Sequence, residues 1–391
     1  MNRQNKLWPA ISAYLGIFLF GIVIITLGSL LPYLTEKYNM SETQGGFVAS
    51  MLAFGILSGS IIFGPLVDRY SFKIPLIIAA LFIAIGMETL VFEHSWFLLQ
   101  FSFITIGFGG GMMNGITNVI INELSSSDQK KRSANFSILG VFYGIGALGT
   151  PILLRILLDK FTHEQIFGGA GLLILLPVIL FIFTSFPEVK NKISFSVSRS
   201  VKMLRNPILI LFGLVAFFQG ALESLPNNWT TTFLPHHAGF SPQTSLTVLS
   251  VFMFSYTIGR IILTWLFKKI SSPVIITISM AMIGSGHFIA ATSTSLPGIL
   301  TAFILIGMGL AAGFPLILGY IGVLYTEASG TAFNIILTFA LIGNIITNYG
   351  MGQMAHQYNI NIFPWFQIVL VIIMAVLLYF SLNLMSKNEK K

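Results

Sequence analysis

Apolar residues occupy most of the chain in long runs, and short polar segments separate these runs. Twelve runs reach the length of about 20 residues that a helix needs to cross the hydrocarbon core of a membrane. Their approximate limits are 9–33, 43–67, 74–92, 96–122, 134–158, 166–186, 207–234, 243–267, 273–293, 297–325, 331–353 and 361–385. The pattern predicts an all-α membrane protein with twelve transmembrane helices.

The composition supports a membrane protein and excludes some kinds of site. Of the 391 residues, 55% are hydrophobic and 9% are charged, and the mean hydropathy is +0.86. Soluble globular domains carry about 25% charged residues. Because the chain has no cysteine, disulfides and thiolate metal sites are excluded.

The basic residues predict how the chain is oriented in the membrane. Seventeen of the 21 Lys and Arg residues fall at the termini or in the even-numbered loops, whereas the odd-numbered loops hold only Lys37 and Lys160. Cytoplasmic loops are enriched in Lys and Arg, so both termini should be cytoplasmic. We therefore expect a multi-pass protein of the cytoplasmic (inner) membrane. The net charge of +8 then reflects topology, and no nucleic-acid partner is expected.

The longest predicted cytoplasmic loop divides the chain into two six-helix halves. We expect an N-terminal bundle over residues 1–186, a cytoplasmic linker over 187–206 and a C-terminal bundle over 207–391.

The two halves show similarity at an offset of 200 residues. GSIIFGPLVDR (59–69) aligns with GRIILTWLFKK (259–269), and FITIGFGGG (103–111) aligns with FILIGMGLA (303–311). Such internal repeats are typical of secondary transporters, whose substrate sites lie near the midplane between the repeats. Two pseudo-symmetric bundles around a central cavity are therefore predicted.

A motif after the second run resembles that of a known family. GPLVDRYSFK is similar to the loop motif G-x-L-a-D-R-x-G-R-K of the major facilitator superfamily, and the matching residues are Gly64, Leu66, Asp68, Arg69 and Lys73. Ser71 and Phe72 depart from the Gly and Arg of the motif. The resemblance implies the fold of that superfamily, with Asp68 and Arg69 in a cytoplasmic latch. Alternatively, these loop charges are only topology signals.

A narrower resemblance, to the fucose/glucose–proton symporter group, rests on short motifs along the length of the chain, including GSLLP at 28–32 and YGIGALGTP at 143–151. Its G-x-E with a Trp six residues after the Glu is similar to Glu223 with Trp229, with one residue more between Gly220 and the Glu. Its G-R pair matches Gly259 and Arg260, and its G-x-F-P resembles GFP at 313–315. The resemblance implies a carrier of hexoses or related polyols.

One departure from that group leaves the coupling of transport open. Its proton-coupled members carry acidic residues in the first and fourth spans, where this chain has Gly28 and Asn114. Symport with a proton or sodium and facilitated diffusion (uniport) are both possible.

Polar residues interrupt the seventh apolar run at a regular spacing. Gln219, Glu223 and Asn227 are four residues apart, so they lie near one face of a helix, and Asn228 and Trp229 follow. An acidic residue near the middle of a span costs about 2.5–3.5 kcal/mol by insertion scales. A water-filled cavity would make this cost tolerable, so the stretch is interpreted as cavity lining. Polar packing between helices is the alternative.

Amides recur in other runs, and they complete the candidate site. The predicted substrate-binding residues are Gln219, Glu223, Asn227, Asn228, Trp229, Asn114, Asn118, Tyr143 and Asn344, and the predicted coupling or gating residues are Glu223, Asp68, Arg69 and Arg260. Neutral amides both donate and accept hydrogen bonds, which suits polyhydroxylated ligands. For Arg260, a gate or structural pairing is preferred to direct ligand contact.

Three functions compete on this evidence. The leading hypothesis is a monomeric carrier of a small neutral solute, a sugar or polyol, without cofactor, metal or enzymatic activity and with membrane lipid as its surroundings. The second is a proton-coupled efflux pump or flippase for amphipathic or cationic compounds, with Glu223 as its cation site and the 36 Phe residues as an apolar wall. The third is a non-transporting sensor, which the lack of a sizeable soluble domain disfavours.

Overall fold

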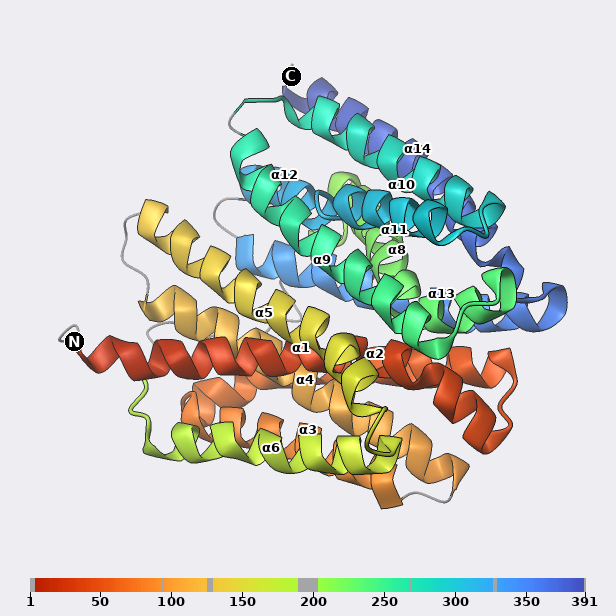
Figure 1. The fold of residues 1–391 in the computed structure, drawn as a ribbon. Helices are drawn as coiled ribbons and strands as arrows, with labels where there is room; N and C mark the ends of the chain where they lie inside the picture. The colour runs from red at the N-terminus through yellow and green to blue at the C-terminus, as the bar shows by residue number, and fades with distance from the viewer. Residues whose placement is uncertain are drawn as a thin grey trace. The chain divides into compact units, whose positions relative to one another are not determined.

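The computed structural model describes residues 4–92, 95–124, 129–188, 203–267, 269–325 and 329–389. The chain forms two compact units (Figure 1). Unit 1 comprises Met1–Tyr38 and Val48–Phe195, and unit 2 comprises Asn39–Phe47 and Ser196–Lys391. Most of the predicted linker, residues 189–202, lies outside the described residues. The predicted domain limits therefore stay a prediction.

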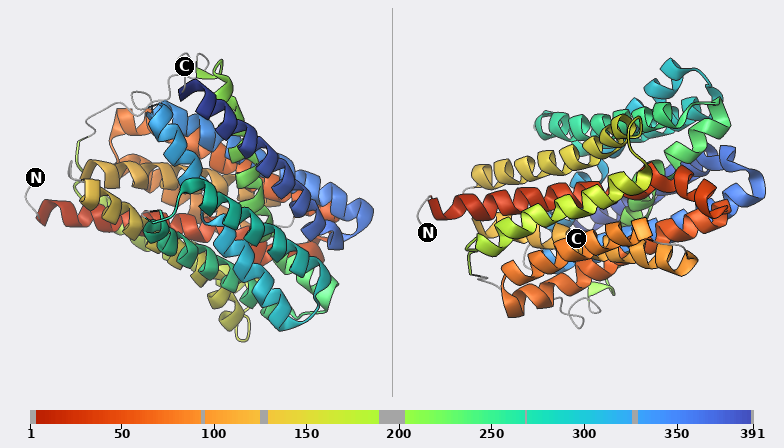
Figure 2. Two further views of the ribbon diagram at one scale, coloured as in Figure 1. Left: turned by 90° about the horizontal axis from the view of Figure 1, so that it is seen from above. Right: turned by 60° about the horizontal axis from the view of Figure 1, so that its bottom comes forward.

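Helices make up nearly all of the described chain, as the views in Figure 2 show. The first six are α1 (Gln4–Tyr38), α2 (Glu42–Tyr70), α3 (Lys73–Phe92), α4 (Trp96–Leu124), α5 (Gln129–Leu157) and α6 (His163–Phe183). The others are α8 (Pro207–Ala238), α9 (Pro242–Leu266), α10 (Ser272–Thr292), α11 (Leu296–Leu310), α12 (Gly313–Leu324), α13 (Ser329–Tyr358), the short 3₁₀ helix η2 (Ile360–Ile362) and α14 (Phe363–Glu389).

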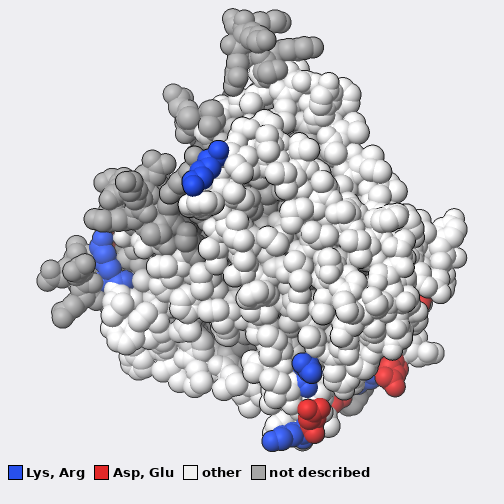
Figure 3. Space-filling model, turned by 45° about the horizontal axis from the view of Figure 1, so that its top comes forward, with Lys and Arg blue, Asp and Glu red and all other residues white. Residues whose placement is uncertain are grey.

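Within the described residues, twelve segments are long and apolar enough to span a membrane, which confirms the predicted number of spans. The face in Figure 3 is almost free of charged side chains, and those visible lie toward its edges. Large apolar side chains such as Leu172, Leu176 and Phe183 on α6 are 60% exposed or more. Such a surface is stable against lipid tails and unfavourable in water.

Local sequence explains where several helices begin and end. Asn206 caps α8, because its side-chain oxygen accepts a hydrogen bond from the Ile208 N–H at 2.9 Å. Gly239 ends the same helix in the left-handed conformation, at φ 66°. Thr162 and Gln165 form a capping box at the start of α6.

The tenth predicted span differs from the sequence expectation, which was one helix over 297–325. It consists of α11 and α12, and the helix is interrupted at Ala311 and Ala312. Pro315 has no N–H to donate to the carbonyl of Ala311, and its ring crowds that carbonyl. The sequence Gly-Phe-Pro at 313–315 thus breaks the span.

Glycines let the helices of unit 1 approach through their backbones. In the crossing of α2 and α4, a Cβ on Gly59 would lie 2.1 Å from the Phe108 carbonyl oxygen, and a Cβ on Gly111 would lie 2.1 Å from the Ile56 carbonyl oxygen. No side chain fits in such a space. The Gly-rich segment of α4 therefore packs helices, in the manner of small residues in other membrane bundles.

Unit 2 repeats these contacts at the predicted offset of 200 residues. A Cβ on Gly107 would collide with the carbonyl oxygen of Leu52, and one on Gly307 would collide with that of Phe252. Similarly, Gly86 faces Ile106 while Gly286 faces Ile306. The packing of α2 and α3 on α4 in unit 1 thus corresponds, residue by residue, to the packing of α9 and α10 on α11 in unit 2.

The turn after α2 holds both residues that depart from the superfamily motif, Ser71 and Phe72. Ser71, which stands where the motif has Gly, adopts a left-handed conformation with φ 60°. This conformation costs an L-residue about 1–2 kcal/mol, whereas Gly adopts it freely. Phe72, at the next departure, is fully buried, and its ring packs against Phe186 at 6.5 Å between centroids.

We expect Gly111→Ala to lower the free energy of unfolding by about 1–3 kcal/mol, because the new methyl group collides with the backbone of α2. Gly140→Ala is the matched control, since a Cβ on this helical glycine meets nothing within 4 Å. Thermal unfolding in detergent measures both. Equal midpoints for Gly111→Ala and the wild type would contradict the close crossing.

We expect Ser71→Gly to raise the free energy of unfolding by about 1 kcal/mol, because it relieves the left-handed strain. Ser58→Gly, in the interior of α2, should instead lower it by about 0.5–1 kcal/mol. The same thermal assay compares the two variants. A loss of stability in Ser71→Gly would show that the turn does not hold the conformation described.

Candidate functional site

The predicted polar stripe lies on α8 in unit 2. Its members differ in how far they reach open space. Glu223 is half-buried, whereas Gln219, Asn227, Asn228 and Trp229 are 8% exposed or less. Among these five side chains, Glu223 is therefore the best placed to contact a ligand.

Glu223 is held by neighbours on α8 and α9. The Gln219 side-chain amide donates a hydrogen bond to the Glu223 carboxylate at 2.8 Å. The hydroxyl of Tyr256 also hydrogen-bonds to this carboxylate, and it accepts a hydrogen bond from the Arg260 guanidinium. The Arg260 side chain lies over the Tyr256 ring, with 4.5 Å between Cζ and the centroid. Donors and one positive charge thus surround the carboxylate, which offsets the cost of placing it in a membrane span.

Gln219 also connects this cluster to the break in the tenth span. Its amide nitrogen lies 3.1 Å from the carbonyl oxygen of Leu310, the last residue of α11, and donates a hydrogen bond to it. A Cβ on Gly313 would lie 2.0 Å from the Gln219 side chain, so only glycine leaves room for the amide there. The Gly-Phe-Pro motif therefore serves two purposes: it breaks the helix and admits Gln219.

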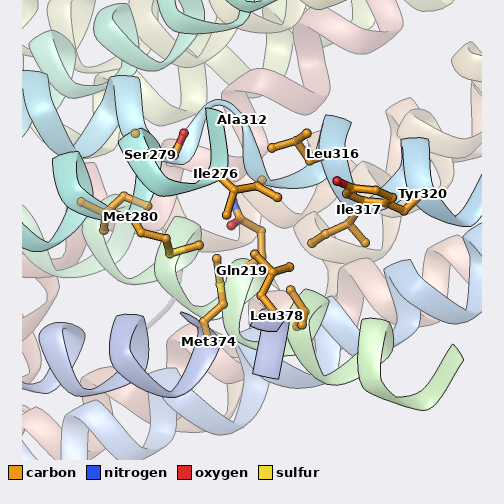
Figure 4. Close-up of a pocket in the computed structure, with 14 residues that line it drawn as sticks. Gln219, Ile276, Ser279, Met280, Ala312, Leu316, Ile317, Tyr320, Met374 and Leu378 are labelled. Carbon is orange, nitrogen blue, oxygen red and sulfur yellow. The ribbon is translucent and has the colours of Figure 1, made fainter. Parts of the chain in front are cut away.

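A small cavity of about 20 Å³ lies beside Gln219, among side chains of α8, α10, α11, α12 and α14. Figure 4 shows the Gln219 side chain among apolar neighbours that include Ile276, Leu316 and Met374. The Gln219 side-chain oxygen is buried and has no hydrogen-bond partner among the described residues. The volume suffices for about one water molecule, so this cavity is too small for a sugar.

A second polar cluster joins α8 to α13, with Asn348 at its centre. The Asn348 side-chain oxygen accepts hydrogen bonds from the Asn228 amide at 3.0 Å and from the Trp229 indole at 3.1 Å. The Asn348 amide donates to the Ser224 hydroxyl at 2.9 Å and to the Asn344 side-chain oxygen at 2.7 Å. Asn348 is fully buried. The predicted stripe is thus divided into a half-buried carboxylate cluster and a buried amide cluster.

The candidates in unit 1 lie on α4 and α5. The Asn118 amide donates to the Asn114 backbone oxygen at 2.8 Å and to its side-chain oxygen at 3.1 Å, and both residues are half-buried. The Tyr143 ring packs against Phe20 of α1 at 5.8 Å between centroids. A role of Asn114, Asn118 and Tyr143 in substrate binding stays a prediction.

The two residues of the predicted latch end α2. Asp68 is half-buried and Arg69 is exposed. The Arg69 guanidinium lies over the ring of the adjacent Tyr70, with 5.2 Å between Cζ and the centroid. The latch itself stays a prediction.

Two residues that complete these clusters, Tyr256 and Ser224, were not indicated by the sequence analysis. Spacing could have indicated Tyr256, because it lies one turn before Arg260; Asn348 lies one turn after Asn344, and this spacing does indicate it. Ser224 carries no pattern of its own. Among the described residues, no group of three or more His, Asp or Glu could hold a metal ion.

Comparisons with known proteins agree with this architecture. A model of the Major Facilitator Superfamily matches residues 13–347 and 230–391. The chain is 26% identical over 365 residues to the uncharacterized MFS-type transporter YfkL of Bacillus subtilis, covering 90% of each chain. It is 22% identical over 377 residues to the glucose/mannose transporter GlcP of the same species, covering 92% of each.

A solved structure shows the same fold. The nucleoside transporter NupG superposes with a TM-score of 0.79 at 16% identity, over 95% of this chain and 99% of its own. Twelve membrane-capable helices, two repeated sets of helix crossings and a family match along almost the whole chain lead to one conclusion. The chain belongs to the Major Facilitator Superfamily and is an integral, multi-pass membrane transporter.

Proposed function

We propose that the protein moves a small neutral polyhydroxylated solute, a sugar or polyol, across the cytoplasmic membrane by alternating access, as a secondary active or facilitative carrier. The observation that carries this proposal is the half-buried Glu223, held by Gln219, Tyr256 and the charge of Arg260. This cluster offers a fixed acceptor flanked by donors, which is the pattern that vicinal hydroxyl groups require.

The charge of the cluster argues for a neutral solute. The positive charge of Arg260 faces the negative charge of Glu223, so the pair is balanced without a ligand. An anionic substrate would need further positive charge. The candidate substrate-binding residues of unit 2 are amides, a carboxylate and an indole.

The relatives also support this class of substrate. GlcP is a glucose/mannose transporter and NupG is a nucleoside transporter, and the ribose of a nucleoside is likewise a neutral polyol. At 22% and 16% identity, these likenesses support the class of solute and not a particular sugar.

The other predicted site residues have proposed roles in binding. On unit 2, substrate binding or the packing of α8 on α13 is the role of Asn227, Asn228, Trp229 and Asn344. On unit 1, the substrate contacts are Asn114, Asn118 and Tyr143.

Coupling and gating are proposed for two pairs of residues. Glu223 and Arg260 couple transport to a proton or sodium, and Asp68 and Arg69 form a cytoplasmic latch. Both termini are proposed to be cytoplasmic, and the working unit a monomer.

We expect a hexose or polyol to raise the melting temperature of the detergent-purified protein, because a ligand at 100 times its Kd adds about 2.7 kcal/mol of stability. The shift should be lost or strongly reduced in Glu223→Gln, which removes the charged acceptor. Glu36→Gln, which removes an exposed carboxylate near the end of α1, should keep the full shift. The measurement is a thermal-shift panel of hexoses, polyols, nucleosides and lipophilic cations.

Other results of that panel would redirect the assignment. Stabilisation by lipophilic cations without any response to sugars or nucleosides would replace this proposal with an efflux pump that uses Glu223 as its cation site. A sugar shift that persists in Glu223→Gln would keep the substrate class and remove Glu223 from the site.

A second variant separates packing from binding in the amide cluster. We expect Asn348→Ala to lower the free energy of unfolding by about 1–3 kcal/mol, because Asn228 and Trp229 lose a buried hydrogen-bond acceptor. If the cluster only packs α8 on α13, the folded fraction keeps its affinity for the sugar found in the panel. A rise of tenfold or more in Kd would instead place Trp229 and Asn228 in the binding site. Asn334→Ala, an exposed amide on the same helix, is the control.

A further inference from the structure

A second hollow lies in unit 1, apart from all residues assigned above. It measures about 370 Å³ and lies between α3 and α6, close to the start of α4. Figure 1 shows α3 and α6 side by side, and the two helices are in contact. Its walls are apolar except for two side chains of α3, Glu88 and Thr89. Its size is in the range of sites that hold small organic ligands.

The Glu88 carboxylate lies in the wall of this hollow, against α6. A Cβ on Gly171 would lie 2.5 Å from the Glu88 Oε1 atom, so the glycine makes room for the carboxylate. This oxygen is buried, and no described residue donates a hydrogen bond to it. The hydroxyl of Thr89 is already committed, because it donates to the Ile85 carbonyl oxygen at 2.7 Å.

A buried carboxylate oxygen without a donor is unfavourable in a membrane span, so the position favours a ligand that supplies both positive charge and N–H groups. The apolar walls favour a ligand whose remaining parts are hydrocarbon. We propose that this hollow binds a membrane lipid whose headgroup carries a primary ammonium, with the ammonium at Glu88 and an acyl chain along α3 and α6.

The surroundings of the hollow indicate access from the bilayer. Of its lining residues, Ile85, Phe92 and Leu172 are at least half exposed, so the site opens on the lipid-facing side of unit 1. Glu88 lies four residues before Phe92, where α3 ends, and this distance corresponds to about 6 Å along the helix. The carboxylate is therefore within reach of a headgroup at the interface.

The headgroup chemistry is selective. A primary ammonium donates hydrogen bonds to the Glu88 carboxylate, whereas the trimethylammonium of choline has no N–H to donate. A phosphoglycerol headgroup is anionic and is repelled by the carboxylate. An ethanolamine lipid satisfies both requirements.

The internal repeat shows that the carboxylate is not required by the scaffold. Two hundred residues later, at the equivalent position in α10, the chain has Phe288. The Phe288 ring packs edge-on against Trp365, at 6.2 Å between centroids. The same place in unit 2 thus carries aromatic rings, and unit 1 alone carries a carboxylate beside a hollow.

Native mass spectrometry of the full-length protein tests the proposal, with phosphatidylethanolamine, phosphatidylcholine and phosphatidylglycerol of identical acyl chains. We expect a preference of about tenfold for the ethanolamine lipid, the size of one charge-assisted hydrogen bond. The preference should fall to about one in Glu88→Gln and stay intact in Glu36→Gln. An equal response to all three lipids, or a preference that survives in Glu88→Gln, would overturn the proposal.

A second pair of variants tests the hollow itself, in case Glu88→Gln does not fold. Leu172→Trp fills the hollow from an exposed position and should lower occupancy by ethanolamine lipid about tenfold. Leu173→Trp changes an equally exposed neighbour that does not line the hollow, and it should have no effect. Equal lipid binding in these two variants would place the lipid elsewhere.

Discussion

The contact of helix backbones at glycine is the constraint on which both units depend. Inside a membrane, burial of apolar surface gives little drive for helices to associate, because lipid tails are as apolar as the side chains. Close packing must supply that drive, and it needs residues without side chains at the crossings. Gly59 and Gly111 meet this need in unit 1, and Gly259 and Gly307 meet it in unit 2.

Several polar side chains of unit 2 lie in hydrogen-bonded clusters. Asn348 gathers four side chains of α8 and α13 around one amide. Glu223 is surrounded by Gln219, Tyr256 and the charge of Arg260, and Gln219 in turn completes the hydrogen bonding at the end of α11. The break in the tenth span and the candidate site therefore depend on each other. A side chain at position 313 would displace the Gln219 amide, which hydrogen-bonds both to the end of α11 and to Glu223.

The sequence predicts the architecture well because membrane spans have a strong one-dimensional signal. Length, apolarity and the offset of 200 residues identified the twelve spans and the repeat. The break at Ala311 was not predicted, because Pro315 lies inside an apolar run that is long enough for one continuous span. Whether such a proline interrupts the helix depends on the neighbouring backbone. The division of the stripe on α8 was also beyond the sequence. A spacing of four residues places Gln219 and Glu223 on one face, but which side chains reach open space depends on partners such as Asn348, more than 100 residues away.

The equivalence of the two units also gives the chain an internal alignment. The contacts of Gly107 with Leu52 and of Gly307 with Phe252 correspond at an offset of 200 residues. Gly21 with Tyr143 corresponds to Gly220 with Ala340, which gives an offset of 199 between α1 and α8, so these contacts identify counterparts in the two units. Where the counterparts agree, the shared residue serves the scaffold. Where they differ in chemistry, as Glu223 differs from Ile24, the scaffold does not explain the difference. In a sequence of this kind, each half can be compared with the other. The positions at which the two halves differ in chemistry are those at which one half has specialised.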